Sequence, residues 1–151
     1  MQEIVDALIQ IGPAGMFVAA FLAGSFFPFS SELVMLGLLE AGADATSLLD
    51  WGTIGNTLGG LFNYGVGSMG KEEWVTRRLK ISPEKLRRGK VYVRHYGAWA
   101  GLLSWIPIFG SVVTIAMGYV RTSILPSIVS ILLGKYLRYQ VLVSAWQAAF
   151  S

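Results

Sequence analysis

Residues 124–150 have the sequence ILPSIVSILLGKYLRYQVLVSAWQAAF, a run of mostly apolar side chains. A helix needs about 20 apolar residues to cross the hydrocarbon layer of a bilayer, which is roughly 30 Å thick. The run at 124–150 is long enough, and so are the apolar runs at 48–69 and 96–120. The sequence therefore predicts an integral membrane protein with several helical segments in the bilayer.

The composition supports the same fold class. Of the 151 residues, 54% are hydrophobic and 14% are charged, whereas ordinary soluble domains have roughly 45–50% apolar and 25% charged residues. A soluble fold of this size cannot bury so much apolar surface. We expect one all-α membrane domain over residues 1–151, with a first half at 12–70, a basic segment at 71–95 and a second half at 96–151.

The basic residues are unevenly distributed along the chain. The formal net charge is +3, yet residues 1–70 contain no Lys or Arg, and nine of the 12 basic residues fall between Lys71 and Arg94. Such clustering indicates membrane topology under the positive-inside rule and not a surface for nucleic acid. We therefore expect segment 71–95 in the cytoplasm and the acidic stretch 41–50 on the opposite side of the membrane.

A helix is predicted within the basic segment. Ser82 is a suitable N-cap and Pro83 a suitable first helical residue. The apolar face of this helix is formed by Leu86, Val93 and Tyr96, and the basic face opposite it by Lys85, Arg87, Arg88 and Lys90. This pattern favours an amphipathic helix on an anionic membrane surface. A cytoplasmic loop that obeys the positive-inside rule is the other interpretation, and both can hold.

Two apolar runs are too short or too interrupted for a straight crossing. Pro28 lies near the end of the run at 12–29, and the run at 33–43 is short. Together they predict a re-entrant hairpin with Pro28 at its tip, an arrangement that is typical of transporter binding sites. A plain loop at the membrane surface is the alternative.

This hairpin has a counterpart in the second half of the chain. The sequence Ser25-Phe26-Phe27-Pro28-Phe29 is similar to Ser104-Trp105-Ile106-Pro107-Ile108, and residues 58–64 match residues 133–139 at Leu, Gly and Tyr. Because the two matches keep their order, the sequence predicts an inverted repeat with a second re-entrant tip at Pro107. Chance similarity between apolar segments is the competing explanation.

The run at 48–69 has one small, polar helix face. Its members recur at three- and four-residue spacing, and they are Gly52, Asn56, Gly59, Gly60, Asn63 and Gly67. Small residues let helices approach closely, and asparagines can hydrogen-bond across the contact. Helix packing is therefore the first interpretation, and a lipid or ion path lined by Asn56 or Asn63 is the second.

Three charged residues within the apolar runs are candidate site residues. Glu32 follows two serines, so it either occupies the first turn of a short helix or forms a proton or cation site at the hairpin tip. Lys135 and Arg138 share one face near the middle of a helix over 124–150. We hypothesise that they bind the phosphate of an anionic lipid, with Glu32 as the counter-charge when no lipid is bound. The alternative is a helix that ends early, with both side chains extending to the surface.

Common catalytic and metal-binding patterns are missing from the sequence. It has no Cys and one His. No nucleophile with a matching base, glycine-rich phosphate loop or metal-ligand spacing occurs in it. We expect no enzyme activity, no metal and no cofactor.

Four motifs between Phe21 and Tyr139 carry a family resemblance. They are Pro28-Phe29-Ser30-Ser31-Glu32; Gly55-Asn56-Thr57-Leu58-Gly59-Gly60, which leads to Tyr64 and Gly67; Ser104-Trp105-Ile106-Pro107; and Gly118-Tyr119-Val120-Arg121. They resemble the motifs of the DedA family of bacterial inner-membrane proteins, which is related to the SNARE-associated Golgi proteins. The short YqaA-like branch is the most similar, because it ends in a motif similar to Gly134-Lys135-Tyr136-Leu137-Arg138-Tyr139.

The resemblance implies a fold, a location and an activity. It implies two re-entrant hairpins that face each other in a multi-pass protein of the bacterial inner membrane. It also implies a role in moving lipids such as undecaprenyl phosphate between leaflets, for which proton coupling has been proposed. Glu32 takes the place of the family's acidic residue. The family's second hairpin has arginines where this chain has Ser104 and Gly110, and the upstream acid of its first hairpin is missing here.

The expected function is that of a transporter or scramblase for anionic lipids. Its expected substrate-binding residues are Glu32, Asn56, Asn63, Lys135 and Arg138. A noncatalytic membrane scaffold or assembly factor is one alternative, and a small proton-coupled solute transporter is another. Anionic membrane lipids are the expected partners, nucleic acid is not, and homo-oligomerisation is left open.

Overall fold

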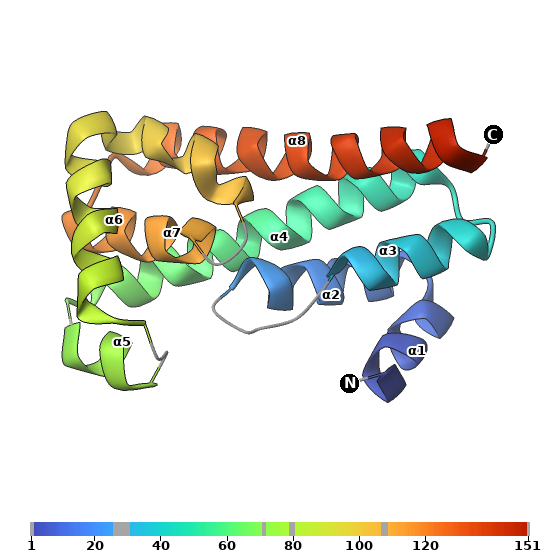
Figure 1. Ribbon diagram of the computed structural model, residues 1–151, viewed down its shortest axis with the longest axis horizontal. Helices are drawn as coiled ribbons and strands as arrows, with labels where there is room; N and C mark the ends of the chain where they lie inside the picture. The colour runs from blue at the N-terminus through green and yellow to red at the C-terminus, as the bar shows by residue number, and fades with distance from the viewer. Residues whose placement is uncertain (1, 26–30, 71, 79–80, 107–108, 151) are drawn as a thin grey trace. The chain divides into compact units, whose positions relative to one another are not determined.

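The computed structural model describes residues 2–25, 31–70, 72–78, 81–106 and 109–150, and their regular secondary structure is helical (Figure 1). In chain order the helices are α1 (Gln2–Ile11), α2 (Pro13–Gly24), α3 (Ser31–Glu40), α4 (Ala45–Ser68), α5 (Glu72–Arg78), α6 (Pro83–Tyr96), the 3-10 helix η1 (Gly97–Trp105), α7 (Phe109–Val120) and α8 (Ile124–Phe150). The expected all-α fold is confirmed. The expected re-entrant tips, Pro28 and Pro107, lie outside the described residues.

The chain forms two compact units, and two helices contribute to both. The first unit comprises Met1–Gly59 and Tyr136–Ser151, and the second comprises Gly60–Lys135. Helices α4 and α8 are long enough that the beginning of each belongs to one unit and the end to the other.

The first unit packs α1, α2 and α3 with the beginning of α4 and the end of α8. Its buried core includes Met16, Val34, Met35, Leu48 and Tyr139. Helix α4 approaches α2 closely, since a Cβ atom added at Gly59 would lie 2.4 Å from the carbonyl oxygen of Phe21. This close approach is what the small helix face of α4 predicts.

The second unit packs α5, α6, η1 and α7 with the end of α4 and the beginning of α8. Its largest core cluster includes Val93, Val113, Ala116, Met117 and Ile131. The glycine face of α4 continues here, because a Cβ atom added at Gly67 would lie 1.9 Å from the carbonyl oxygen of Ile115.

Helix α6 begins where the sequence predicts, but protein covers its apolar face. The Ser82 side chain accepts a hydrogen bond from the Lys85 backbone N–H at 3.1 Å, and Pro83 is the first helical residue. A Cβ atom added at Gly89 would lie 2.8 Å from Val112 of α7, so the apolar face packs on α7 and not on lipid. Tyr96, expected on that face, is 52% exposed.

A motif glycine approaches a motif serine in each of the two units. A Cβ atom added at Gly59 would lie 2.7 Å from the Ser25 nitrogen in the first unit, and one added at Gly134 would lie 3.0 Å from Ser104 Oγ in the second. These four residues belong to the two motifs that the sequence repeats. The first unit contains α2, which ends near Ser25, together with α3, the beginning of α4 and the end of α8. The second unit contains η1, which ends near Ser104, together with α7, the beginning of α8 and the end of α4.

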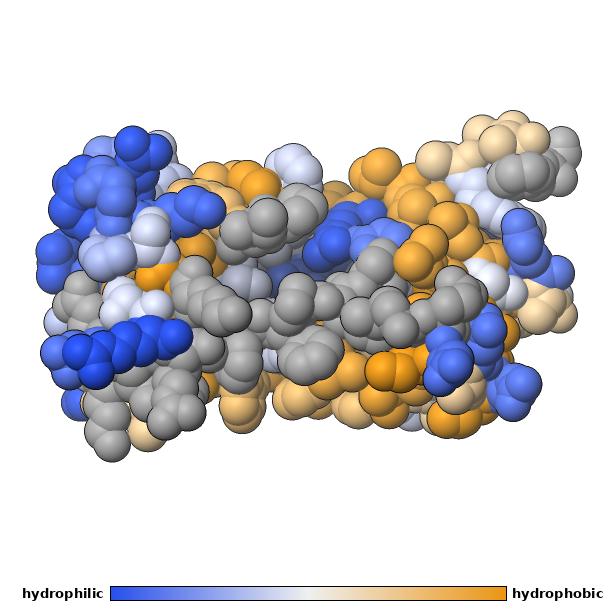
Figure 2. All heavy atoms as spheres, turned by 60° about the horizontal axis from the view of Figure 1, so that its bottom comes forward, coloured by the Kyte–Doolittle hydropathy of each residue, from blue (hydrophilic) through white to orange (hydrophobic). Residues whose placement is uncertain are grey.

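One helix of the described residues is long and apolar enough to cross a membrane, and it runs from Ile124 to Ala149 within α8. Helices α2 and α7 are apolar but shorter. Many exposed residues of α8 are apolar, and they include Leu125, Val129, Leu133, Leu137 and Val141. In Figure 2 apolar side chains spread over much of the visible face, and polar ones gather over α5 and α6 at the left.

Candidate functional site

An ion pair between Arg138 and Glu32 is the centre of the candidate site. Glu32 lies in the first turn of α3, where a carboxylate is favoured by the helix dipole. Arg138 lies near the middle of α8, and its guanidinium contacts the Glu32 carboxylate. The Arg138 side chain is 19% exposed and that of Glu32 is 28% exposed. The expected counter-charge for Arg138 is confirmed, and so is the placement of Glu32 in a first helical turn.

A hydrogen bond lies directly beside this ion pair. The hydroxyl groups of Ser31 and Tyr139 are 2.6 Å apart, and both residues are fully buried. The Arg138 guanidinium lies 5.9 Å from the centroid of the Tyr139 ring. Arg138 and Tyr139 of α8 thus contact Glu32 and Ser31 of α3. These two contacts fix the register between the two helices. The sequence analysis did not select Ser31 or Tyr139, although both belong to motifs that it quoted.

Lys135 is a buried cation in the second unit. Its side chain is 3% exposed, and its Nζ donates a hydrogen bond of 2.8 Å to the carbonyl oxygen of Ser104. Ser104 lies in the last turn of η1, where carbonyl groups carry partial negative charge. Helix α8 continues well past Lys135. The alternative of an early helix end with Lys135 at the surface is therefore wrong.

Lys135 and Arg138 lie on the same face of α8, because residues three apart in a helix are neighbours. Their contacts differ, since Lys135 bonds to a carbonyl of the second unit and Arg138 pairs with a carboxylate of the first. Glu32 is thus the carboxylate partner that the structure gives to Arg138.

The two asparagines of α4 hold neighbouring helices. Asn56 Nδ2 donates to the carbonyl oxygen of Ala20 at 2.8 Å in the first unit, and Asn63 Nδ2 donates to Thr114 Oγ1 at 3.2 Å in the second. Both asparagines are fully buried. Their role in helix packing is confirmed, and a role in substrate binding stays a prediction.

Known proteins similar to this chain cover most of its length. An uncharacterized protein of Haemophilus influenzae is 34% identical over 138 residues, which cover 85% of this chain and 83% of the relative. The inner membrane protein YqaA of Escherichia coli is 33% identical over 131 residues, covering 86% of this chain and 87% of YqaA. YqaA of Shigella flexneri matches to the same extent. The chain belongs to the YqaA family.

Membership of the YqaA family places the chain in the bacterial inner membrane, as the sequence analysis expected. No family model matches the chain, and no solved structure matches it. The resemblance to the YqaA-like branch is confirmed at the level of homology. The wider DedA relationship stays a prediction.

This YqaA-family chain also has a polar cluster on α4 that the sequence analysis missed. Thr53 Oγ1, Asn56 Oδ1 and Thr57 Oγ1 are buried and have no hydrogen-bond partner within the described part of the chain. Buried polar atoms of this kind are uncommon and call for an explanation such as water or an ion. The glycines and asparagines of this helix face were predicted from the sequence but its threonines were not, although Thr53 and Thr57 lie one turn from each other beside Asn56.

The described residues of this YqaA-family chain show no obvious metal site. Among them, no three His, Asp or Glu side chains lie close enough together to hold a metal ion. The interactions that the described site residues make are the ion pair of Arg138 and Glu32 and the hydrogen bonds of buried amides and hydroxyls.

Proposed function

We propose that this YqaA-family protein moves anionic lipids between the leaflets of the inner membrane and that Arg138 binds the lipid phosphate. The observation that carries this proposal is the ion pair of Arg138 and Glu32. Ionisable residues within membrane segments are costly, and they usually mark substrate or ion pathways. Arginine presents a planar set of donors that matches phosphate, so a phosphate can replace the Glu32 carboxylate on the same guanidinium.

The depth of Arg138 supports this assignment. Arg138 lies about 21 Å along α8 from Ile124, at roughly 1.5 Å per residue. A hydrocarbon layer is roughly 30 Å thick, so Arg138 is far from either end of a spanning α8. A headgroup that passes between leaflets needs a polar partner at such a depth. Lys135 is a second positive charge one turn earlier in α8.

The protein's architecture in this proposal is an inverted repeat with two re-entrant hairpins, as in the DedA family. The close approaches of Gly59 to Ser25 and of Gly134 to Ser104 support equivalent halves. In this proposal, one hairpin consists of α2 and α3 and the other of η1 and α7. Irregular backbone at membrane depth is tolerated where protein or water surrounds it.

Proton coupling is part of the proposal. When phosphate takes Arg138, the Glu32 carboxylate gives up this ion pair, and losing a nearby opposite charge makes the charged form of a carboxyl group less favourable. Binding a proton removes that charge. A proton taken up at this step and released when Glu32 returns to Arg138 would link lipid movement to proton movement.

The test is lipid exchange in liposomes that contain the purified protein. A reagent that reaches only the outer leaflet reports movement of a fluorescent anionic lipid. We expect the wild type to move lipid, and so should the control variant Arg94→Gln, which alters an exposed arginine. Arg138→Gln should move lipid about tenfold or more slowly, because hydrogen bonds to charged groups contribute roughly 1.5–3 kcal/mol.

Two results would contradict the proposal. If the wild type leaves exchange at the rate of empty liposomes, the protein is not a lipid transporter, and the alternative of a noncatalytic scaffold gains support. If Arg138→Gln inserts, folds and moves lipid at the unaltered rate, Arg138 is not the phosphate ligand.

A further inference from the structure

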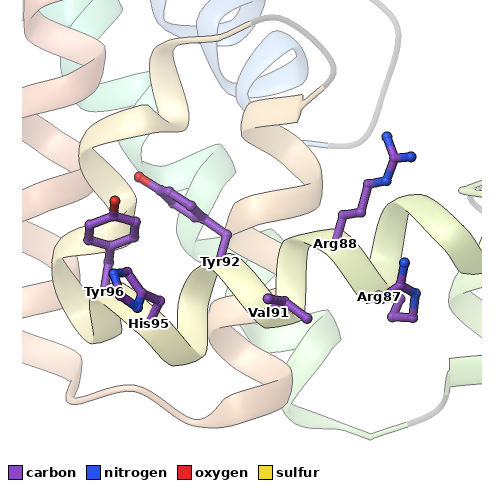
Figure 3. Close-up of a pocket in the computed structure, with 6 residues that line it drawn as sticks. All are labelled: Arg87, Arg88, Val91, Tyr92, His95 and Tyr96. Carbon is purple, nitrogen blue, oxygen red and sulfur yellow. The ribbon is translucent and has the colours of Figure 1, made fainter.

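A groove of cationic and aromatic side chains lies on α6, away from the Arg138 ion pair. It has a volume of about 390 Å³ and is lined by Arg87, Arg88, Val91, Tyr92, His95 and Tyr96. Figure 3 shows the three rings at one end of the groove, the two arginines at the other, and Val91 between them. We propose that this groove binds the headgroup of an anionic phospholipid at the membrane surface.

The groove faces outward because the opposite side of α6 is occupied. Leu86, Gly89 and Val93 are buried, and Gly89 packs against α7. Arg87, Arg88 and His95 are exposed, and Val91 is 55% exposed. The groove is therefore accessible to a membrane component, with an apolar residue at its centre.

Both arginines already converge on one anionic group. Arg87 binds the Glu84 carboxylate through Nη2 at 2.5 Å and through Nε at 3.1 Å, and Arg88 Nε reaches the same carboxylate at 3.3 Å. A guanidinium offers five N–H donors, so these contacts leave donors for a phosphate. The three residues together carry one net positive charge.

The aromatic end of the groove favours a lipid over a soluble anion. The Tyr92 and Tyr96 rings have centroids 4.6 Å apart, and His95 meets Tyr96 edge to face at 4.5 Å. Exposed Trp99 and Trp105 follow on η1. Tyrosine and tryptophan concentrate at the membrane interface, where lipid headgroups lie. In an inner-membrane protein, a phosphate on the arginines therefore comes from a neighbouring phospholipid.

Site-specific crosslinking on the full chain tests this proposal. The protein has no cysteine, so Val91→Cys carries a single benzophenone label in the groove. The labelled protein is illuminated in neutral detergent micelles that contain radiolabelled phosphatidylglycerol or phosphatidylcholine. We expect clear capture of phosphatidylglycerol and little of phosphatidylcholine, because only the former carries a net negative charge.

Matched double variants separate the groove from general attraction. Two double variants are made in the labelled protein. One combines Arg87→Gln with Arg88→Gln, and the other combines Lys85→Gln with Arg94→Gln. Each removes the same amount of positive charge from α6. The first pair should lower capture roughly fivefold, as loss of charge-assisted bonds predicts, and the second should leave it nearly unchanged. Glu84→Gln removes the competing carboxylate and should raise capture.

Three results would overturn the assignment. Equal loss in both double variants would mean non-specific electrostatic attraction, and equal capture of both lipids would mean apolar contact alone. Abolition of capture by millimolar inorganic phosphate would mean a site for free phosphate. Arg138→Gln should not change capture, so failure of the groove and failure of the Arg138 site are distinguishable.

Discussion

Arg138 and Tyr139 are neighbours on α8, yet their contacts to α3 serve different purposes. The Tyr139 hydroxyl bonds the buried Ser31 hydroxyl, a contact between two neutral groups. The Arg138 contact joins two charges that a ligand phosphate can separate. The first contact is suited to hold α3 in place while the second opens and closes.

Replacing Tyr139 by Phe tests this division of roles. The change removes the hydroxyl and keeps the ring in the core, so we expect the free energy of unfolding to fall by about 0.6 kcal/mol, as for side-chain hydrogen bonds in membrane proteins. Lipid exchange in liposomes should remain near the wild-type rate. A loss of exchange as large as that of Arg138→Gln in a folded Tyr139→Phe protein would show that the two contacts are not separable.

Glu84 offers a titration test of the arginine contacts on α6. The hydrogen bond from Arg87 and the nearby positive charge lower the pKa of Glu84 from its ordinary value of 4.5. The ion pair therefore contributes fully above pH 4.5, and its contribution is lost as the pH falls through the lowered pKa of the folded state. The NMR chemical shift of the Glu84 carboxyl carbon should titrate with a midpoint below pH 4.5. In the Arg87→Gln variant, this midpoint should move back towards 4.5. An unchanged midpoint would mean that the ion pair does not form in solution.

At the scale of elements, apolar length and spacing determine what the sequence can predict. Helix α8 has the bounds Ile124–Phe150, which are those of the apolar run, and α6 begins after Ser82 as its capping residues predict. Periodicity identifies which face of α6 is apolar, but it does not show what covers that face, and α7 does so. The helices α1 and α5 were not predicted at all.

The candidate site was predictable in its charges and less so in its neutral residues. A charge within an apolar run stands out, which is how Glu32, Lys135 and Arg138 were selected. A buried threonine does not stand out, because its hydroxyl usually bonds within its own helix. Thr53 and Thr57 become notable only when the structure shows them buried without such a partner among the described residues.

Two glycines of α4 provide a test of helix packing in the second unit. A Cβ atom added at Gly67 would lie 1.9 Å from the carbonyl oxygen of Ile115, whereas one added at Gly65 would have no described atom within 4 Å. We expect Gly67→Ala to lower the free energy of unfolding by about 1–3 kcal/mol through overpacking. Gly65→Ala should be neutral or stabilising by up to roughly 1 kcal/mol, because alanine favours helix. Thermal unfolding in detergent measures both, and equal effects would refute the close contact.

At the scale of the whole molecule, the long helices α4 and α8 each link the two units. Helix α4 ends in the second unit and α8 ends in the first.

The direction of the chain across the membrane is the last property to test, and the charges predict it. Nine basic residues lie between Lys71 and Arg94, and the acidic residues Asp44 and Asp50 lie before them. Under the positive-inside rule, the basic segment remains in the cytoplasm. Asp44 therefore belongs on the outer side of the inner membrane and Arg88 on the inner side.

Single cysteines at these two positions decide the orientation, and the cysteine-free wild type is the blank. Both Asp44 and Arg88 are exposed, so a lack of labelling cannot come from burial in the protein. On cells whose outer membrane has been made permeable, a thiol reagent that cannot cross the inner membrane should label Asp44→Cys and not Arg88→Cys. After lysis it should label both, which confirms that each variant is present and reactive. Labelling of Arg88→Cys alone before lysis would reverse the orientation.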